Sequence, residues 1–134
     1  MTGLNADGWS QMLCACIAEY KPIVKKGDKP WCNVRTFTLE DYAHRRWEDR
    51  GLAIAWRDAL EEYDLLVGWN TVKFDVPYLN TRLQEYDCRP LRLKMHKDAM
   101  YTARFKMKLD SASLENVSTY LRIHEKYNIA KTKL

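Results

Sequence analysis

Apolar and polar positions alternate along the chain in blocks that predict strands and helices in turn. Residues 11–20 are apolar at successive positions, which predicts a strand buried on both sides. Residues 21–30 combine lysines with Gly and Pro, and this composition predicts a hairpin connection. Residues 33–37 predict the returning strand, and Thr38 is a good N-cap for a following helix. The first part of the chain therefore predicts a β-hairpin that leads into a helix.

The later blocks predict short strands separated by helices. Apolar positions recur with a helical period over residues 47–63, with Gly51 as a candidate break. Residues 64–68 form a short apolar run, as in a parallel strand. The remaining predicted elements are a helix near Pro77 with Val76, Leu79, Leu83 and Tyr86 inward, a strand over 91–96, a helix over 98–106, and a helix from Ser113 with Leu114, Val117 and Leu121 inward. The order β-β-α-β-α-β-α-α indicates an α/β fold.

The turn between the strand at 64–68 and the helix at Pro77 is the best candidate site. Asp75 lies there beside a helix N-terminus, where backbone N–H groups and the helix dipole favour negative charge. Open α/β sheets bind ligands just outside the carboxyl ends of their strands. A carboxylate in this place, with Asn70 nearby, suits a metal or phosphate site. Two other interpretations stay open: Asp75 as a helix N-cap, and Asn70 as a turn-forming residue.

The segment from Gly68 to Arg82 reads Gly-Trp-Asn-x3-Phe-Asp-x-Pro-Tyr-Leu-x2-Arg. It resembles the second motif of the DEDD-type 3′–5′ exonucleases of proofreading and phage replication, with Trp69 where a His is common. The resemblance extends over residues 2–134 and implies a single partial domain, residues 1–134. Its implied fold is ribonuclease H-like, a mixed sheet flanked by helices. By the same resemblance Asp75 is a catalytic metal ligand for Mg²⁺ or Mn²⁺, and Asn70 contacts the substrate.

Most of the acidic residues that this family needs cannot be assigned. Thr2, Gly3 and Leu4 resemble the residues that follow the first acidic strand, so the resemblance places them beside the terminal nucleotide. No Asp follows Tyr127, where the last acid is expected. Two-metal hydrolysis needs several carboxylates, so we interpret the chain as a fragment or degenerate form of a DNA exonuclease domain, inactive by itself. Without its first strand the sheet is incomplete, and its exposed edges predict homo-oligomers.

Charge and cysteine spacing add weaker indications. A net charge of +4 fits a phosphate backbone, and we expect single-stranded DNA or another nucleic acid as partner. A set of lysines could line a groove for it or simply be solvated: Lys106, Lys108, Lys126, Lys131 and Lys133. The spacing of the cysteines predicts no zinc site, with Cys14 and Cys16 as small core residues. The chain opens without a signal-peptide pattern and lacks a long apolar run, which predicts a cytoplasmic protein, in host cytoplasm if viral, with no membrane partner.

Several further residues carry two interpretations. His96 and Asp98 lie at the end of a predicted strand, where helix capping is favoured for Asp98 over catalysis. Phe74 is expected in the core. Three tyrosines could stack on bases or pack in the core: Tyr78, Tyr101 and Tyr120. The alternative functions are a non-enzymatic ribonuclease H-like domain that binds nucleic acid or a replication partner, and a scaffold in which Asp75 is only a cap.

Overall fold

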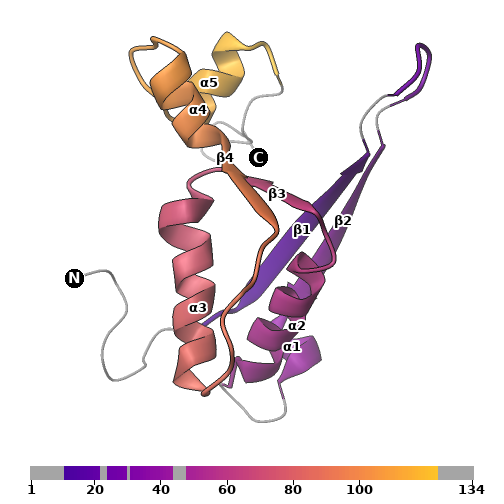
Figure 1. The fold of residues 1–134 in the computed structure, drawn as a ribbon, viewed down its shortest axis with the longest axis vertical. Helices are drawn as coiled ribbons and strands as arrows, with labels where there is room; N and C mark the ends of the chain where they lie inside the picture. The colour runs from indigo at the N-terminus through magenta and orange to yellow at the C-terminus, as the bar shows by residue number, and fades with distance from the viewer. Residues whose placement is uncertain (1–10, 22–23, 30, 44–47, 124–134) are drawn as a thin grey trace, which may run out of the picture.

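Two pairs of strands and the helices between them make up the part of the chain that the computed structural model describes, residues 11–21, 24–29, 31–43 and 48–123 (Figure 1). In chain order the elements are β1 (Cys14–Lys21), β2 (Trp31–Thr38), α1 (Leu39–Tyr42), α2 (Arg50–Leu60), β3 (Leu65–Gly68), the π-helical turn η1 (Thr71–Asp75), α3 (Val76–Glu85), β4 (Met95–Asp98), α4 (Ala99–Lys106) and α5 (Leu114–Tyr120). This order confirms the predicted succession of strands and helices and the α/β class.

The strands form two separate sheets rather than one. β1 and β2 pair antiparallel, from Cys14 opposite Thr38 to Lys21 opposite Trp31. β3 and β4 pair parallel, from Leu65 opposite Met95 to Gly68 opposite Asp98. Among the described residues no hydrogen-bonded pairing joins the two sheets. The predicted α/β class and its incompleteness are therefore confirmed, but the antiparallel and parallel strands lie in two small sheets, and each of the four strands has an edge without a described partner.

The core lies between the hairpin and the helices α2 and α3. Its fully or nearly fully buried side chains are Met12, Ile17, Phe37, Leu52, Ala53, Ala59, Leu60, Leu79 and Leu83. The helical period predicted for residues 47–63 and for the helix at Pro77 gives the buried faces of α2 and α3. Thr38 caps α1 as predicted, since its side chain accepts a hydrogen bond from the backbone of Asp41.

The prediction that residues 11–20 are buried on both sides is wrong. Ile17 is buried, but Cys14 and Cys16 are exposed, so they are not the core residues that we expected. Alternate residues of a strand point to opposite faces. Only the face that carries Ile17 and Phe37 packs against the core, and the other is uncovered by described residues. No described element packs over the apolar side chains of that second face.

Gly51 does not break α2. It lies in the first turn of the helix, where a Cβ atom would overlap the backbone carbonyl of Tyr42. A side chain at this position would push α1 away from α2. Gly51 is therefore explained by the close approach of the two helices.

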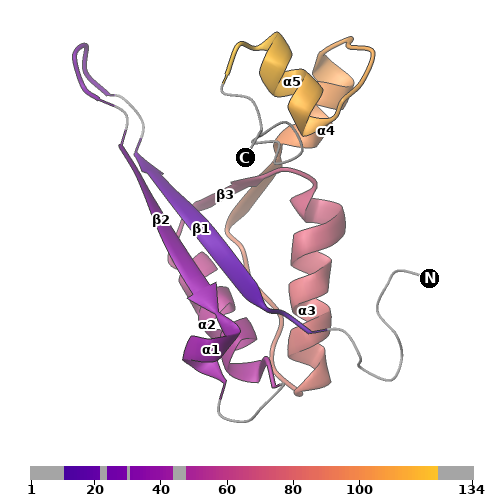
Figure 2. The ribbon, with the colours of Figure 1, turned by 180° about the vertical axis from the view of Figure 1, so that it is seen from behind.

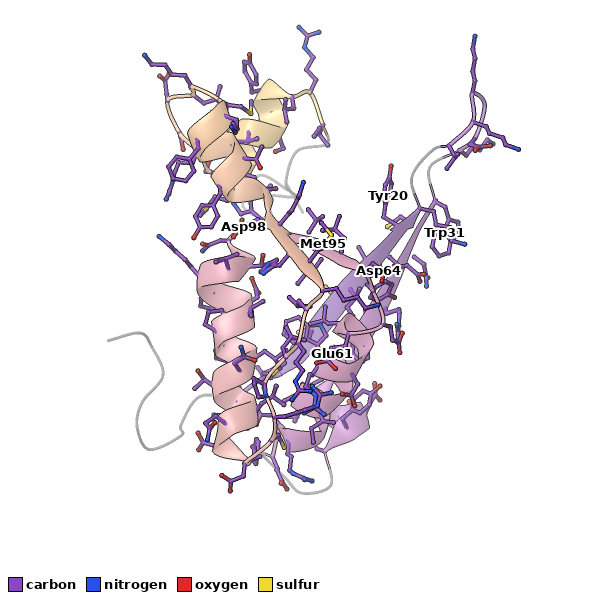
Figure 3. All side chains as sticks on the ribbon, viewed as in Figure 1. Tyr20, Trp31, Glu61, Asp64, Met95 and Asp98 are labelled. Carbon is purple, nitrogen blue, oxygen red and sulfur yellow. The ribbon has the colours of Figure 1, made fainter. Side chains whose placement is uncertain are left out.

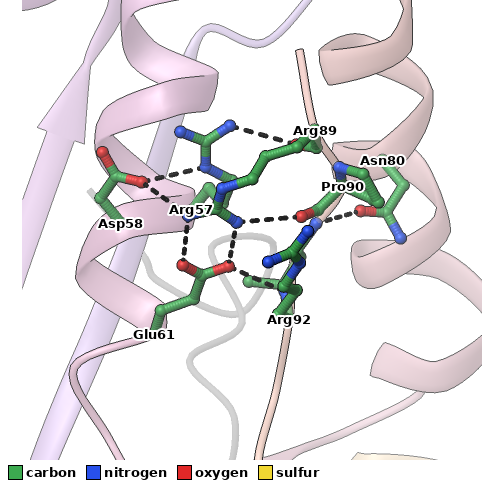
Figure 4. Close-up of polar contacts among 8 residues, drawn as sticks. Arg57, Asp58, Glu61, Asn80, Arg89, Pro90 and Arg92 are labelled. Atoms are coloured by element: carbon green, nitrogen blue, oxygen red, sulfur yellow. Dashed lines mark hydrogen bonds and ion pairs between the residues drawn. The ribbon is translucent and has the colours of Figure 1, made fainter.

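A network of side chains fixes the crossing from α3 to β4, as Figure 4 shows. The guanidinium of Arg89 donates to both carboxylate oxygens of Glu61, each at 2.7 Å, and these bonds help to lower the pKa of Glu61 to about 2. The backbone N–H of Leu91 donates to Asn80 Oδ1 at 2.9 Å, and that of Arg92 donates to Glu61 Oε1 at 2.8 Å. Because side chains engage these N–H groups, the predicted strand over 91–96 begins only at Met95.

A buried ion pair joins α2 to α3. Arg82 donates from Nε and Nη2 to the two carboxylate oxygens of Asp49, both at 2.9 Å. The Tyr86 hydroxyl donates to Asp49 Oδ1 at 2.5 Å, and the Met12 N–H donates to Oδ2 at 2.7 Å. Burial by itself would raise the pKa of Asp49, but these hydrogen bonds outweigh it and lower the pKa. Arg82, the last residue of the resembling motif, therefore has a structural role.

The last two helices are only partly covered. Ser113 caps α5 as predicted, and Val117 is buried. Leu114 and Leu121 were expected to point inward, but they are exposed because no described element packs over them. No helix among the described residues is long and apolar enough to cross a membrane.

Candidate functional site

The chain reverses sharply after β3, and three residues explain why it can. The methyl and hydroxyl of Thr71 occupy the space that a side chain on Gly68 would need. Asn70 adopts a left-handed conformation with φ 59°, which Asn tolerates better than most residues. The Thr71 hydroxyl is hydrogen-bonded to His96 Nε2 at 2.7 Å, which ties the turn to β4. The Gly-x-Asn part of the motif is thus accounted for by backbone geometry.

Asp98 anchors the same turn from the end of β4 (Figure 3). Its Oδ1 accepts the N–H of Asn70 at 2.9 Å and that of Met100 at 3.1 Å, and its Oδ2 accepts the N–H of Val72 at 3.1 Å. The residue is 6% exposed. The predicted capping role is confirmed, because the bond to Met100 caps α4. The bonds to Asn70 and Val72 are a second role that the sequence did not reveal.

Asp75 ends the turn η1 and directly precedes α3. Its backbone is helical, with φ −62° and ψ −45°, and its side chain makes no capping bond to α3. An N-cap side chain reaches its helix from an extended backbone, so the continuous passage from η1 into α3 excludes the cap geometry. Apart from its own backbone N–H, no hydrogen-bond donor among the described residues engages this carboxylate. Asp75 is therefore left available for a ligand.

The surroundings of Asp75 disfavour its charge. Burial raises the pKa of this carboxyl above its ordinary value, and the nearby negative charge of Asp98 raises it further, against the opposing effect of its own N–H. A partly buried carboxylate beside a second carboxylate is a common arrangement where a cation binds. A divalent cation would relieve both unfavourable effects at once.

Phe74 was expected in the core, and this prediction is wrong. Its ring is 62% exposed and stacks on Tyr78, with 6.0 Å between the ring centroids and 9° between the ring planes. Four residues apart, the two rings are neighbours on the helical surface, and Tyr78 is half-buried against the edge of the core. The exposed ring of Phe74 therefore directly precedes Asp75 and is supported from one side by the ring of Tyr78.

Two other aromatic residues of the C-terminal part, Phe105 and Tyr120, are exposed, whereas Tyr101 is half-buried. Tyr101 of α4 packs against Phe105, which is 74% exposed, at a centroid distance of 6.1 Å. Tyr120 is 63% exposed, so core packing is excluded for it within the described residues. Lys106 and Lys108 are exposed, as both of their interpretations required.

The described residues bring together only part of the predicted site. Asp75 and the turn of Asn70 lie in one place, but Thr2, Gly3, Leu4 and the lysines from Lys126 onward lie outside the described residues. Asn70 supports the turn-forming interpretation through its backbone, and its contact with substrate stays a prediction. The described part of the chain holds no group of three or more His, Cys, Asp or Glu residues that could bind a metal. Asp75 can therefore supply one carboxylate to a ligand, and its metal-binding role stays a prediction.

A cavity of about 380 Å³ lies elsewhere, between α1 and α2. Its lining residues are Asp41, Tyr42, Ala43, Glu48, Arg50, Gly51, Ile54 and Ala55. None of them belongs to η1 or α3, and residues 44–47, which follow Ala43 in the sequence, lie outside the described chain. The position of Asp75, between β3 and the start of α3, is the better guide to function.

Comparison with known proteins gives one match. The sequence model of the RNase H superfamily matches residues 32–133, which include β2 from Cys32 onward, β3, β4 and all helices of the described residues, but not β1. No curated protein and no solved structure matches the chain significantly.

Proposed function

Because the chain belongs to the RNase H superfamily, a group of nuclease-like and nucleic-acid-binding domains, we propose that it is part of a metal-dependent 3′–5′ exonuclease domain that acts on DNA. One observation carries the exonuclease assignment. The Asp75 carboxylate follows β3 at the start of α3 and is not used as a helix cap. The turn fixes where Asp75 lies, but no described side chain donates a hydrogen bond to its carboxylate.

The side chains around Asp75 have distinct roles in this proposal. Asp75 binds Mg²⁺ or Mn²⁺, ions that take carboxylate oxygens together with substrate phosphate oxygens. When bound, such an ion activates water and stabilises the leaving oxygen of a phosphodiester. Phe74, stacked on Tyr78, offers an exposed ring on which an unpaired base can stack. Asp98 is a positioning residue, because its three backbone hydrogen bonds hold the turn that carries Asp75.

A two-metal site needs more carboxylates than Asp75 provides. Asp98 already accepts three backbone N–H bonds, and the described residues contain no group of three possible metal ligands. Of the four acids that the family resemblance implies, only Asp75 can be assigned. We therefore expect no repeated turnover from this chain alone.

The lack of a group of three possible metal ligands among the described residues favours a second candidate function, a non-enzymatic module that binds nucleic acid. Such a module would keep the aromatic surface beside Asp75 and need no metal. The two candidates differ in one measurable respect, since only a metal ligand at position 75 makes DNA binding depend on a divalent cation.

The test is binding of a 5′-labelled single-stranded oligonucleotide with a free 3′ end, followed by fluorescence anisotropy with Mg²⁺ or with chelator. We expect Mg²⁺ to strengthen binding, and Asp75→Asn to remove that increase. Asp87→Asn is the matched control, because Asp87 is exposed and its φ of 54° suits Asn. A DNA affinity that changes neither with Mg²⁺ nor with the Asp75 substitution would support the non-enzymatic module instead.

The same oligonucleotide tests for catalysis. With Mg²⁺ or Mn²⁺ we expect no shortening beyond a small fraction of one turnover. Many turnovers that disappear in Asp75→Asn would contradict the incomplete site and show that this chain supplies the other ligands itself.

A further inference from the structure

The end of the β1–β2 hairpin projects away from the rest of the described chain, as Figures 1 and 2 show from opposite sides. Six described residues there form what we call the basic tip: Tyr20, Lys21, Lys25, Lys26, Lys29 and Trp31. Residues 20–31 contain four lysines and a single acid, Asp28, so three of the chain's four net positive charges fall in this short segment. Charge is therefore concentrated at a point far from the core.

Local hydrogen bonds engage Asp28 with the backbone of the turn, and they involve none of the lysine side chains. The backbone N–H of Lys25 donates to Asp28 Oδ2 at 3.0 Å, and the N–H of Asp28 donates to the Lys25 carbonyl at 3.1 Å. Gly27, with φ 100°, completes this tight turn. Residues 24–29 are all exposed, and none of the four lysines forms an ion pair with a described carboxylate.

Two aromatic side chains lie at the base of the turn (Figure 3). They belong to opposite faces of the hairpin, because Trp31 pairs with Lys21, the neighbour of Tyr20. Tyr20 is 61% exposed and Trp31 is 43% exposed. The Lys21 ammonium lies 5.0 Å from the centre of the Trp31 ring, which keeps a positive charge against an exposed ring face. Large exposed aromatic side chains beside lysines have no role in the hydrophobic core and need another explanation.

We propose that the basic tip binds single-stranded nucleic acid, with its lysines on phosphate oxygens and with Trp31, on the same face of the hairpin as Lys21, stacked against an unpaired base. Lysines that track a backbone, together with aromatic side chains that stack on bases, are what sequence-independent single-strand binding requires. The ligand class rests on the proposed function, but the surface is separate from η1 and α3. The tip gives the chain a second contact on a strand whose end is held at Asp75.

The test compares two triple substitutions that remove equal charge. Lys25→Gln/Lys26→Gln/Lys29→Gln changes the tip, and Arg50→Gln/Arg92→Gln/Arg122→Gln changes exposed arginines outside it. For a labelled oligothymidine at about 50 mM salt, we expect the tip variant to bind at least about tenfold more weakly, and its slope of log K against log salt to fall by about 2. The arginine variant should change affinity by less than about threefold.

Trp31→Leu separates stacking from charge. It should weaken single-strand binding about fivefold or more and leave the salt slope unchanged, because stacking releases no counterions. It should also leave binding to a duplex of the same length unchanged, since paired bases offer no free face. This variant keeps the test decisive if the lysine variant associates, given that lysines also protect strand edges.

Wild-type affinity in the lysine variant, or an equal loss in the arginine variant, would overturn the inference. Equal effects on duplex and single strand would overturn its single-strand part, and binding only to vesicles with anionic lipid would overturn the ligand class. An unchanged tip variant whose Mg²⁺-dependent binding still requires Asp75 would reject the tip alone. No binding of nucleic acid by the wild-type chain would reject the proposed function as well.

Discussion

At the scale of single residues, Asp75 is placed where its charge costs stability. Its pKa is raised in the folded state by burial and by Asp98. A raised pKa contributes stability that is present below the ordinary aspartate pKa and is lost as pH rises through the folded value. At neutral pH the ionised group therefore opposes folding, which is typical of a residue kept for binding rather than for stability.

This sign gives a prediction for Asp75→Asn. The variant should have a higher free energy of unfolding than the wild type near neutral pH, and the difference should disappear at about pH 3. Urea unfolding at the two pH values measures both quantities. A loss of about 1 kcal/mol at neutral pH would instead show that Asp75 acts as a helix cap.

Asp98 is predicted to behave in the opposite way. Asp98→Asn replaces one acceptor oxygen by an amide group that cannot accept the N–H bonds, so we expect a loss of about 2 kcal/mol in the free energy of unfolding. Hydrogen exchange should become faster at the N–H groups of Asn70 and Val72, which Asp98 holds. The exposed Asp110→Asn serves as control and should change stability by less than about 0.5 kcal/mol. Unchanged exchange at Asn70 and Val72 would contradict the anchoring role.

Residue identity alone predicted the capping role of Asp98 and placed Asp75 at the start of a helix, whereas metal binding by Asp75 stays a prediction. It did not locate the environment of Phe74, since whether a ring is buried depends on which helical face the turn η1 presents. Nor did it reveal the pairing of Asp49 with Arg82, which lie 33 positions apart. Long-range partners of this kind leave no local signal.

At the scale of elements, the Asp49–Arg82 pair decides how α3 sits against α2. Both side chains are almost completely buried, at 0% and 4% exposure. Removing one partner leaves an uncompensated buried charge, so we expect Arg82→Met to lower the free energy of unfolding by about 3–5 kcal/mol. Replacing both, as Asp49→Leu/Arg82→Met, should recover a large part of that loss. A double variant less stable than Arg82→Met would contradict this account of the pair.

Helices were predicted better than strands, for a physical reason. The apolar stripes of α2 and α3 are periodic in the sequence and need only one neighbouring layer to be buried. The burial of β1 depends on what covers each of its two faces, and the length of β4 depends on side chains that bind the amides of Leu91 and Arg92. The residues of β1 do not show what will cover its faces, and those of β4 do not show which side chains will bind the preceding amides.

At the scale of the whole molecule, the two sheets leave apolar side chains and backbone edges exposed. Val67 of β3 is 59% exposed and Met95 of β4 is 56% exposed, beside an edge without a described partner. Free edges of this kind pair with strands of other chains. We therefore predict a dimer or higher oligomer in sedimentation velocity at low micromolar concentration, shifted toward monomer by Val67→Lys. A wild-type monomer that melts cooperatively at high temperature would contradict this prediction.

The central claim is that Asp75 binds a divalent metal ion, and Mn²⁺ alone tests it most directly. Binding is measured by the electron paramagnetic resonance signal of free Mn²⁺ during titration of the wild-type chain, Asp75→Asn and Asp87→Asn. We predict that Asp75→Asn weakens Mn²⁺ binding by about tenfold or more, as expected for loss of a carboxylate ligand, and that Asp87→Asn binds like the wild type. Equal Mn²⁺ affinity in all three proteins would contradict the claim.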